Sequence, residues 1–567
     1  MDIGKRRWQW PLTILAGLVA IAAHASGAPE QSLVQRIEAL QAGYAVQVLG
    51  DAILARQTLQ RFYENRGYRL AWAQESRREA LADAIERLPR DGLNPADYHG
   101  ELLQELARRP EATLSDDLIA DRDLLFTDAF LLAASHLADG KVNPESIHAE
   151  WTLTGRRTDI VPLLTRALDN GSLAQTLQDL RPRNADYLKL VQAREHLSRL
   201  LGQPWLPIPD GPSIRPGDTD TRLPVIRRRL IALEDLSANA SASSELYDGE
   251  LEAALPDFQA RHGLEPDGII GRQTLDALNL MPVERIRQID ASLERWRWLP
   301  DSLGDTYVLV NIAGFRLQMV RNGKEVLHSR VIVGRPFRQT PVFSDRIRYL
   351  VFNPTWTVPR KLMIEDQLPE IQRDPDYLER LGIEVFEGWG ADRRKVDPGS
   401  VDWDTLSKNR FPYQLVQGPG PKNALGRVKF MFPNRYDVYL HDTPSRYLFG
   451  RQERTFSSGC IRVERPFDLA EQLLANDMDW DRQRINDLLA TGETTTVVLP
   501  IPIPIHIQYW TAWVDEQGHL QFRDDIYHRD GPLINELRHS ALADRQLPTP
   551  VAVSPTTIAA GRIHKTH

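Results

Sequence analysis

The hydrophobic pattern of the chain changes its period once, and that change limits the fold more than any other feature. Up to residue 298, apolar side chains recur mostly every three or four positions, as in Leu81, Ile85 and Leu88, which indicates helices. From Thr306 onward, apolar and polar residues alternate, as in strands with one buried face. A chain of 567 residues is also too long for one hydrophobic core. We therefore expect a multidomain α+β protein, with helices first and a β domain after them.

The helical part divides into a large and a small unit. Residues 29–203 are expected to form a helical scaffold domain, in which no polar cluster has the spacing of a catalytic or metal site. Residues 204–221 are rich in Pro, Gly and Asp, which predicts an extended linker. Residues 222–282 hold three short helical patterns and predict a compact three-helix module, followed by a connecting helix over residues 283–298.

Residues 300–515 are predicted to form an antiparallel β domain. The Asn322-Gly323 pair between two strand patterns is the preferred two-residue hairpin turn. Residues 359–415 interrupt the strands with helical runs and are too long for a plain connection. We interpret them as a helical insertion that covers the site as a lid, the alternative being an insertion remote from any chemistry. Residues 516–567 form a C-terminal extension whose end is predicted to be disordered.

The N-terminus has the features of an export signal. Lys5-Arg6-Arg7 is followed by an uncharged apolar run and by Ala23-His24-Ala25, a typical cleavage sequence. Residues 1–28 are therefore interpreted as a signal peptide or, if uncleaved, as an anchor in the inner membrane. The net charge of -8 and the pI near 6.0 argue against nucleic-acid binding. An exported chain with one cysteine has no internal disulfide, and an unpaired thiol in an oxidising compartment suggests a chemical use.

That cysteine, Cys460, follows a histidine on a short predicted strand. Residues 438–441 alternate in character, so Tyr439 and His441 are expected on one face. Gly459 lets the backbone approach whatever Cys460 faces. A neighbouring imidazole can accept the thiol proton or, as imidazolium, stabilise the thiolate, and backbone N–H groups of the turn can face an oxyanion. The alternative is a small buried cysteine and a structural histidine.

The stretch around both residues resembles the signature of the L,D-transpeptidase family of cell-wall enzymes. In that family a His is followed, after a gap, by Ser/Thr-His-Gly-Cys, an apolar residue and Arg or Asn. Here His441 precedes Ser457-Ser458-Gly459-Cys460-Ile461-Arg462. Large periplasmic members from Gram-negative bacteria also carry Ser-Ser-Gly-Cys and a Leu-His-Asp-Thr-Pro segment, as residues 440–444 do, and the resemblance covers most of the chain. Because Ser458 replaces the second histidine, His441 has to carry proton transfer alone.

The resemblance implies that Cys460 is the nucleophile and that His441 is the general acid and base. The donor would be a tetrapeptide stem of peptidoglycan whose third residue is a diamino acid. Cys460 would form a thioester with release of D-alanine, and the side-chain amine of a neighbouring stem would complete a 3→3 cross-link. The loop of Ser458 and Gly459 would face the oxyanion, with the backbone N–H groups of Gly459 and Cys460 as its donors.

Two further residues have both a functional and a structural interpretation. Tyr439 would orient the substrate or the imidazole, or else pack as a strand aromatic. Arg462 would bind a substrate carboxylate, or else form a structural ion pair. Residues 222–282 resemble a peptidoglycan-binding module, and the alternative is a spacer that binds nothing.

The resemblance also implies the setting of the enzyme. It predicts a periplasmic protein without metal or cofactor, whose partners are peptidoglycan stem peptides and cell-wall synthases and whose thiol reacts with carbapenems. Three other functions stay open: an L,D-carboxypeptidase whose thioester goes to water, a transferase that tethers a lipoprotein, and a wall-binding scaffold without turnover.

Overall fold

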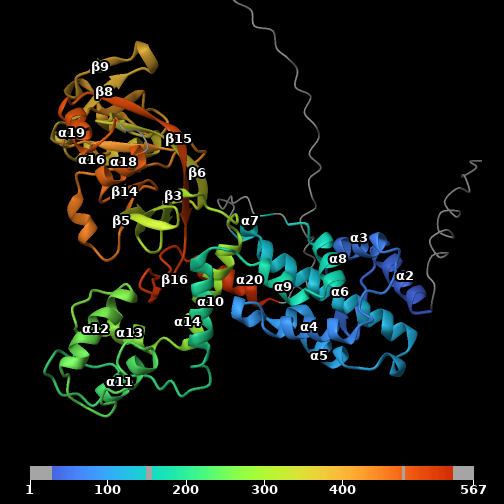
Figure 1. The fold of residues 1–567 in the computed structure, drawn as a ribbon. Coiled ribbons are helices and arrows are strands. Elements are labelled where there is room, and N and C mark those ends of the chain that lie inside the picture. Colours follow the sequence, from blue (N-terminus) through green and yellow to red (C-terminus); the bar gives the residue numbers. More distant parts are fainter. Residues whose placement is uncertain (1–27, 148–155, 157, 476–478, 540–567) are drawn as a thin grey trace, which may run out of the picture.

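The computed structural model describes residues 28–147, 156, 158–475 and 479–539 (Figure 1). The segment interpreted as a signal peptide or anchor lies outside the described residues, apart from Ala28, and so does the C-terminal end predicted to be disordered. Within the described ranges, no helix combines the length and the apolar character that crossing a membrane requires.

The N-terminal region is the predicted helical scaffold. Its centre is α6 (Asp116–Asp139), a helix buried along most of its length, which starts where the Ser115 hydroxyl accepts a hydrogen bond from the Leu118 N–H at 3.3 Å. Six helices pack around it: α2 (Ala28–Gln41), α3 (Arg56–Asn65), α4 (Glu75–Glu86), α5 (Gly100–Ala107), α8 (Ile160–Asn170) and α9 (Leu173–Asp179). Helices α7 (Pro144–Ile147) and α10 (Ala185–Ser198) pack against other hydrophobic cores. A small hairpin of β1 (Gln47–Val48) and β2 (Asp51–Ala52), which periodicity did not reveal, completes the domain.

The three-helix module consists of α11 (Leu223–Ala232), α12 (Gly249–Arg261) and α13 (Arg272–Asn279). The interpretation of residues 204–221 as an extended linker is wrong in part, because this segment folds onto the module. Ile208 and Ile214 are buried in the module core, and Ile214 exchanges backbone hydrogen bonds of 3.1 and 3.0 Å with Ile270. The high proline content suggested a linker, although two apolar side chains of this segment are buried against the helices.

The predicted connecting helix is present as α14 (Pro282–Arg297), and it lies between the other parts of the molecule (Figure 1). It shares a core with α10 and with a C-terminal hairpin of β16 (Ala512–Val514) and β17 (Leu520–Phe522). Its Arg295 pairs with Asp530 at 2.6 Å, at the start of α20 (Asp530–Arg538). The C-terminal extension is therefore folded against α14 as far as residue 539.

The predicted β domain contains a nine-stranded sheet, in the order β13-β5-β14-β12-β11-β6-β15-β3-β4, and β4 also pairs with β5, so the sheet closes on itself. Its strands are β3 (Thr306–Asn311), β4 (Arg316–Arg321), β5 (Lys324–Gly334), β6 (Phe343–Phe352), β11 (Val428–Met431), β12 (Leu440–His441), β13 (Thr455–Ser457), β14 (Ile461–Val463) and β15 (Thr495–Gln508). Helices α18 (Pro466–Leu474) and α19 (Arg482–Ala490) pack against it.

Most strand pairs are antiparallel, as expected, but β3–β15, β5–β13 and β12–β14 are parallel. The hairpin predicted at Asn322-Gly323 is confirmed, since both residues have positive φ between β4 and β5. Strand β15 contains three prolines and still pairs with β6 on both sides of them, with an irregularity between Val498 and Ile503.

The insertion over residues 359–415 is not only helical. It contains α15 (Arg360–Leu362), a π-helical turn (Met363–Gln367), α16 (Leu368–Arg373) and α17 (Tyr377–Leu381). A separate four-stranded sheet joins β7 (Trp356–Thr357), β10 (Tyr413–Gln417), β8 (Ile383–Glu387) and β9 (Arg394–Val396). These strands are short and separated by turns, so the sequence pattern did not distinguish them from loop. The insertion has its own hydrophobic core and is a subdomain.

Candidate active site

The parallel pairing of β12 with β14 places four candidate residues on one face of the sheet. Leu440 lies opposite Ile461, and both are fully buried in the core. Because side chains alternate along a strand, the residues on either side of this pair point the other way. These are Tyr439, His441, Cys460 and Arg462. Two neighbouring strands thus bring the imidazole and the thiol to the same face of the sheet.

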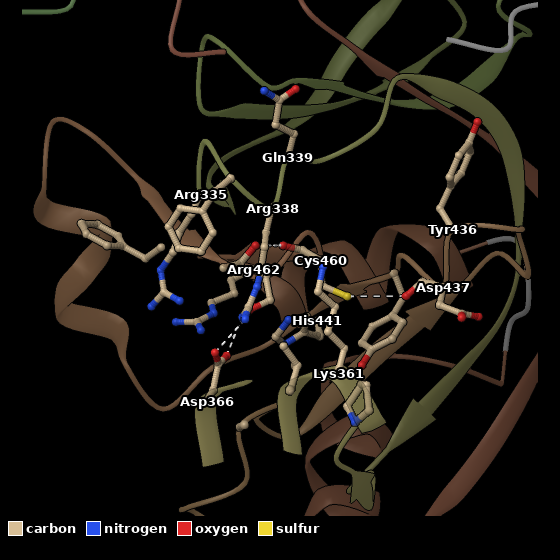
Figure 2. A pocket seen from close by; sticks show the side chains of 18 of the residues that line it. Arg335, Arg338, Gln339, Lys361, Asp366, Tyr436, Asp437, His441, Cys460 and Arg462 are labelled. Carbon is tan, nitrogen blue, oxygen red and sulfur yellow. Dashed lines mark hydrogen bonds and ion pairs between the residues drawn. The ribbon is translucent and has the colours of Figure 1, made fainter. Parts of the chain in front are cut away.

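All four side chains line one cavity of about 1150 Å³ (Figure 2). The insertion contributes Lys361 and Asp366 to the same cavity, so it does not lie remote from the site. Arg529, from the C-terminal extension, also lines it. The cavity is therefore built by three parts of the chain, and its volume suits an extended peptide better than a small molecule.

The His441 imidazole is arranged as a base. Its Nδ1 lies 2.6 Å from the Asp442 carbonyl oxygen, which can only accept a hydrogen bond. Nδ1 therefore carries the proton, and Nε2 keeps the lone pair that can accept one. Burial, reinforced by the nearby cations Arg462 and Lys429, lowers the pKa of His441 to about 3. Those two residues are its partners in strand register, one on β14 and one on β11.

The Cys460 thiol is in its neutral form near pH 7. It is half-buried, and burial raises its pKa to about 11, although the Tyr439 hydroxyl, within hydrogen-bonding reach, opposes the shift. Its sulfur lies 3.7 Å from the Asp437 carbonyl oxygen, which accepts from the thiol (Figure 2). In the free protein the thiol thus donates to a backbone carbonyl and not to His441, and the resting pair consists of a neutral thiol and a neutral imidazole.

This resting state predicts the titration of the thiol. Because the pKa of Cys460 is raised, its thiolate forms only as the pH rises towards about 11. We expect no thiolate ultraviolet absorption between about pH 5 and pH 9, measured as the difference between wild type and Cys460→Ala. A thiolate band already present at neutral pH, and absent from Cys460→Ala, would instead demonstrate a preformed thiolate–imidazolium pair.

The loop before the nucleophile has one open backbone donor. Gly459 adopts a φ of 117°, which favours glycine, and its N–H donates to the Ser457 hydroxyl at 3.1 Å. The Ser457 hydroxyl in turn donates to the Cys460 carbonyl oxygen at 2.5 Å. Within the residues that the structure describes, the Cys460 N–H has no acceptor. Of the two expected oxyanion donors, the Cys460 N–H is thus free and the Gly459 N–H is already engaged.

Ser458 connects this loop to the insertion. Its hydroxyl accepts a hydrogen bond of 3.0 Å from Arg338. The Arg338 guanidinium also pairs with Asp366 at 2.5 Å (Figure 2) and with Glu365 at 2.7 Å. Both acids lie on the π-helical turn of the insertion. Ser458 has no titratable group that could replace a second histidine. Arg338 itself was missed, because an isolated arginine in a loop has no distinguishing sequence pattern.

Arg335, Lys361 and Arg462 line the cavity without an ion pair among the described residues. Arg462 Nε is buried without a hydrogen bond, and neither Arg462 nor Arg335 forms an ion pair in the described part of the chain. Burial and the nearby Arg335 lower the pKa of Arg462, so the two guanidinium groups repel one another. The structural ion pair considered for Arg462 is therefore absent from the described part of the chain, and Arg335 is a further cation that sequence reasoning missed.

Tyr439 contacts both reactive groups. Its ring centroid lies 5.7 Å from that of His441, and its hydroxyl reaches the thiol. The ring also packs partly against the domain core, and the Lys429 ammonium lies 5.9 Å from its centroid. Tyr439 thus combines the packing role with contacts to the reactive pair. Among the described residues, no cluster of His, Cys, Asp and Glu could hold a metal ion.

Comparison with known domains identifies the domain that contains this site. Residues 305–499 match the L,D-transpeptidase catalytic domain. The chain carries an L,D-transpeptidase catalytic domain. Residues 221–278 match a model described as "Putative peptidoglycan binding domain", and residues 57–193 match a scaffold domain. The L,D-transpeptidase domain thus contains the His441–Cys460 pair, whereas Arg529 in the cavity lies beyond its matched end.

Two curated relatives share parts of the sequence. A protein of Haemophilus influenzae named "Putative L,D-transpeptidase" is 38% identical over 264 residues, which cover 46% of this chain and 52% of that protein. The N-acetylmuramoyl-L-alanine amidase CwlM of Mycobacterium tuberculosis is 38% identical over 76 residues, which cover 12% of this chain and 19% of that protein. The chain thus spans about half or less of these relatives.

Solved L,D-transpeptidase structures are also similar to the chain. The enzyme from Stackebrandtia nassauensis is 14% identical, with 53% of this chain and 97% of that chain covered and a TM-score of 0.22. The enzyme from Mycobacterium smegmatis is 12% identical, with 36% and 58% covered and a TM-score of 0.18.

Proposed function

We propose that the protein is a peptidoglycan L,D-transpeptidase that forms 3→3 cross-links through a thioester on Cys460. One observation carries the proposal: a thiol and an imidazole whose Nδ1 is held by a backbone carbonyl share one face of a peptide-sized cavity with two arginines that have no ion pair among the described residues. The L,D-transpeptidase domain supplies the reaction class, and the peptidoglycan-binding match supports the same polymer as substrate.

The first half-reaction forms the thioester. Sγ of Cys460 attacks the carbonyl carbon of the third stem residue while His441 Nε2 takes the thiol proton. The resulting oxyanion is stabilised by the Cys460 N–H and, once Ser457 releases it, by the Gly459 N–H. The bond to D-alanine then breaks, and the protonated His441 returns its proton to the leaving amine. Because the resting pair is neutral, this proton transfer accompanies the attack.

The second half-reaction transfers the acyl group. The side-chain amine of a neighbouring stem attacks the thioester and gives its proton to His441. The carbon–sulfur bond breaks, the amide of the 3→3 link forms, and the thiolate regains a proton from His441. Water in place of the amine would give a free tripeptide carboxylate, so the outcome depends on which nucleophile reaches the thioester.

Arg462 and Arg335 are the proposed carboxylate contacts. Stem peptides carry several carboxylates, and a guanidinium binds such a group through two parallel hydrogen bonds. A bound carboxylate would also relieve the repulsion between the two arginines, which lie close together without a counter-ion in the described part of the chain. The positive charge of these two arginines is thus complementary to the negative charge of an anionic peptide.

The proposed setting is the periplasm. Peptidoglycan lies outside the cytoplasm, and the basic and apolar N-terminal residues are those of an export signal. Cell-wall synthases are the proposed partners, since they make the strands that the enzyme would link. The reaction needs no metal or cofactor, because the thiol, the imidazole and the backbone N–H groups supply the nucleophile, the proton transfer and the charge stabilisation.

Incubating purified protein with disaccharide-tetrapeptide and resolving the products by mass tests this function. A cross-linked dimer that has lost one D-alanine is expected from wild type, and no product is expected from Cys460→Ala. Tripeptide without dimer would instead indicate an L,D-carboxypeptidase. An unchanged substrate would contradict the enzymatic proposal and favour a wall-binding scaffold.

A further inference from the structure

We infer that Thr340 and Tyr527 are positioning residues for the nucleophile loop, and that the C-terminal segment 525–530 acts on catalysis through them. This inference rests on the proposed function, because it assigns the geometry of Cys460 to side chains elsewhere in the chain. The two residues come from different regions: Thr340 follows β5, and Tyr527 lies beyond the matched end of the L,D-transpeptidase domain.

Thr340 binds the nucleophile loop directly. Its side chain is fully buried, and its hydroxyl donates to the Gly459 carbonyl oxygen at 2.8 Å. The same hydroxyl accepts from the Gly334 N–H at 2.9 Å, so its one proton is committed to Gly459. The Gly459–Cys460 peptide contains both this carbonyl and the free Cys460 N–H. Holding the carbonyl therefore fixes the direction of the proposed oxyanion donor.

Tyr527 holds the segment that carries Thr340. Its hydroxyl donates to the Gly334 carbonyl oxygen at 2.5 Å and accepts from the Thr340 N–H at 3.3 Å, which joins the two ends of the loop over residues 334–340. This loop is tightly folded, since a Cβ atom at Gly334 would lie 2.1 Å from the Arg338 carbonyl oxygen. The Arg529 guanidinium adds a contact of 2.8 Å to Gln339.

The C-terminal segment is itself held by hydrogen bonds and an ion pair to residues outside it. The Tyr527 N–H donates to the Tyr509 hydroxyl at 3.0 Å, and that hydroxyl donates to Asp525 at 2.6 Å. Asp525 also accepts from the Asp530 N–H at 2.7 Å, and Asp530 pairs with Arg295 of α14. A continuous set of buried and partly buried hydrogen bonds thus runs from α14 to the nucleophile loop, and such a network restrains the residues that it joins.

Removing only the hydroxyl groups tests the inference. Thr340→Val and Tyr527→Phe keep side-chain shape but lose the hydrogen bonds, and Thr340→Ser restores the hydroxyl. We expect both hydroxyl-free variants to slow the maximal rate of acylation by a carbapenem at least about tenfold, as small displacements of reacting groups do. The half-saturating carbapenem concentration is expected to stay unchanged, and Thr340→Ser is expected to recover most of the rate.

A matched control separates positioning from stability. Thr274 in the module is also buried, and its hydroxyl likewise donates to a carbonyl, of Ile269 at 3.2 Å, and accepts from Gln259 at 3.2 Å. Thr274→Val is expected to lower the thermal midpoint about as much as Thr340→Val without slowing acylation.

Wild-type acylation rates in both Thr340→Val and Tyr527→Phe would overturn the inference and leave the function standing. A loss explained by unfolding, seen as fewer reactive molecules at an unchanged rate constant, would also overturn it. No acylation of wild type would instead contradict the proposed function.

Discussion

Replacing His441 by alanine is expected to slow acylation of Cys460 by about a thousandfold, the size of effect that a general base provides. The structure gives the reason: the thiol is neutral near pH 7, so attack requires a group that takes its proton during the step. Ser458 stands where many family members have a second histidine, and its hydroxyl is occupied by Arg338. The rate constant of carbapenem acylation, followed by intact-protein mass, measures the effect.

The pH dependence of this variant is a second readout. Without His441 the reaction must use the small fraction of preformed thiolate, so its rate should rise about tenfold per pH unit below the raised pKa of the thiol. His506 provides the control, since it is also a buried histidine of this domain, hydrogen-bonded to Ser344 at 2.8 Å and to the Leu303 carbonyl at 3.0 Å. His506→Gln should reduce stability and leave acylation intact. A His441→Ala rate within tenfold of wild type would assign the base elsewhere.

The reactive pair could be predicted from the sequence because its signals are local. The alternation of residues 438–441 places Tyr439 and His441 on one face, and the Ser-Gly-Cys turn presents Cys460 beside them. Their protonation state could not be predicted, since it depends on burial and on Lys429 and Arg462 in neighbouring strands.

The supporting residues were not predictable for a different reason. One loop without regular periodicity contains Arg335, Arg338 and Thr340. Tyr527 lies in the C-terminal extension, 187 positions after Thr340. Each acts through hydrogen bonds or a charge that only the tertiary fold brings into place. Composition also gave a wrong prediction for the proline-rich residues 204–221. A high proline content indicates a stiff backbone, but it does not indicate whether the isoleucines between the prolines are buried.

The central claim is that Cys460 is the acylated nucleophile, and the mass of the intact protein after exposure to a carbapenem tests it most directly. The strained amide of the drug stands in for the stem peptide bond, and the chain has a single thiol. We predict a shift of one drug equivalent in wild type and none in Cys460→Ala, a variant whose small side chain should leave the fold and the cavity unchanged. An unmodified wild-type protein, or an equal shift in Cys460→Ala, would contradict the account.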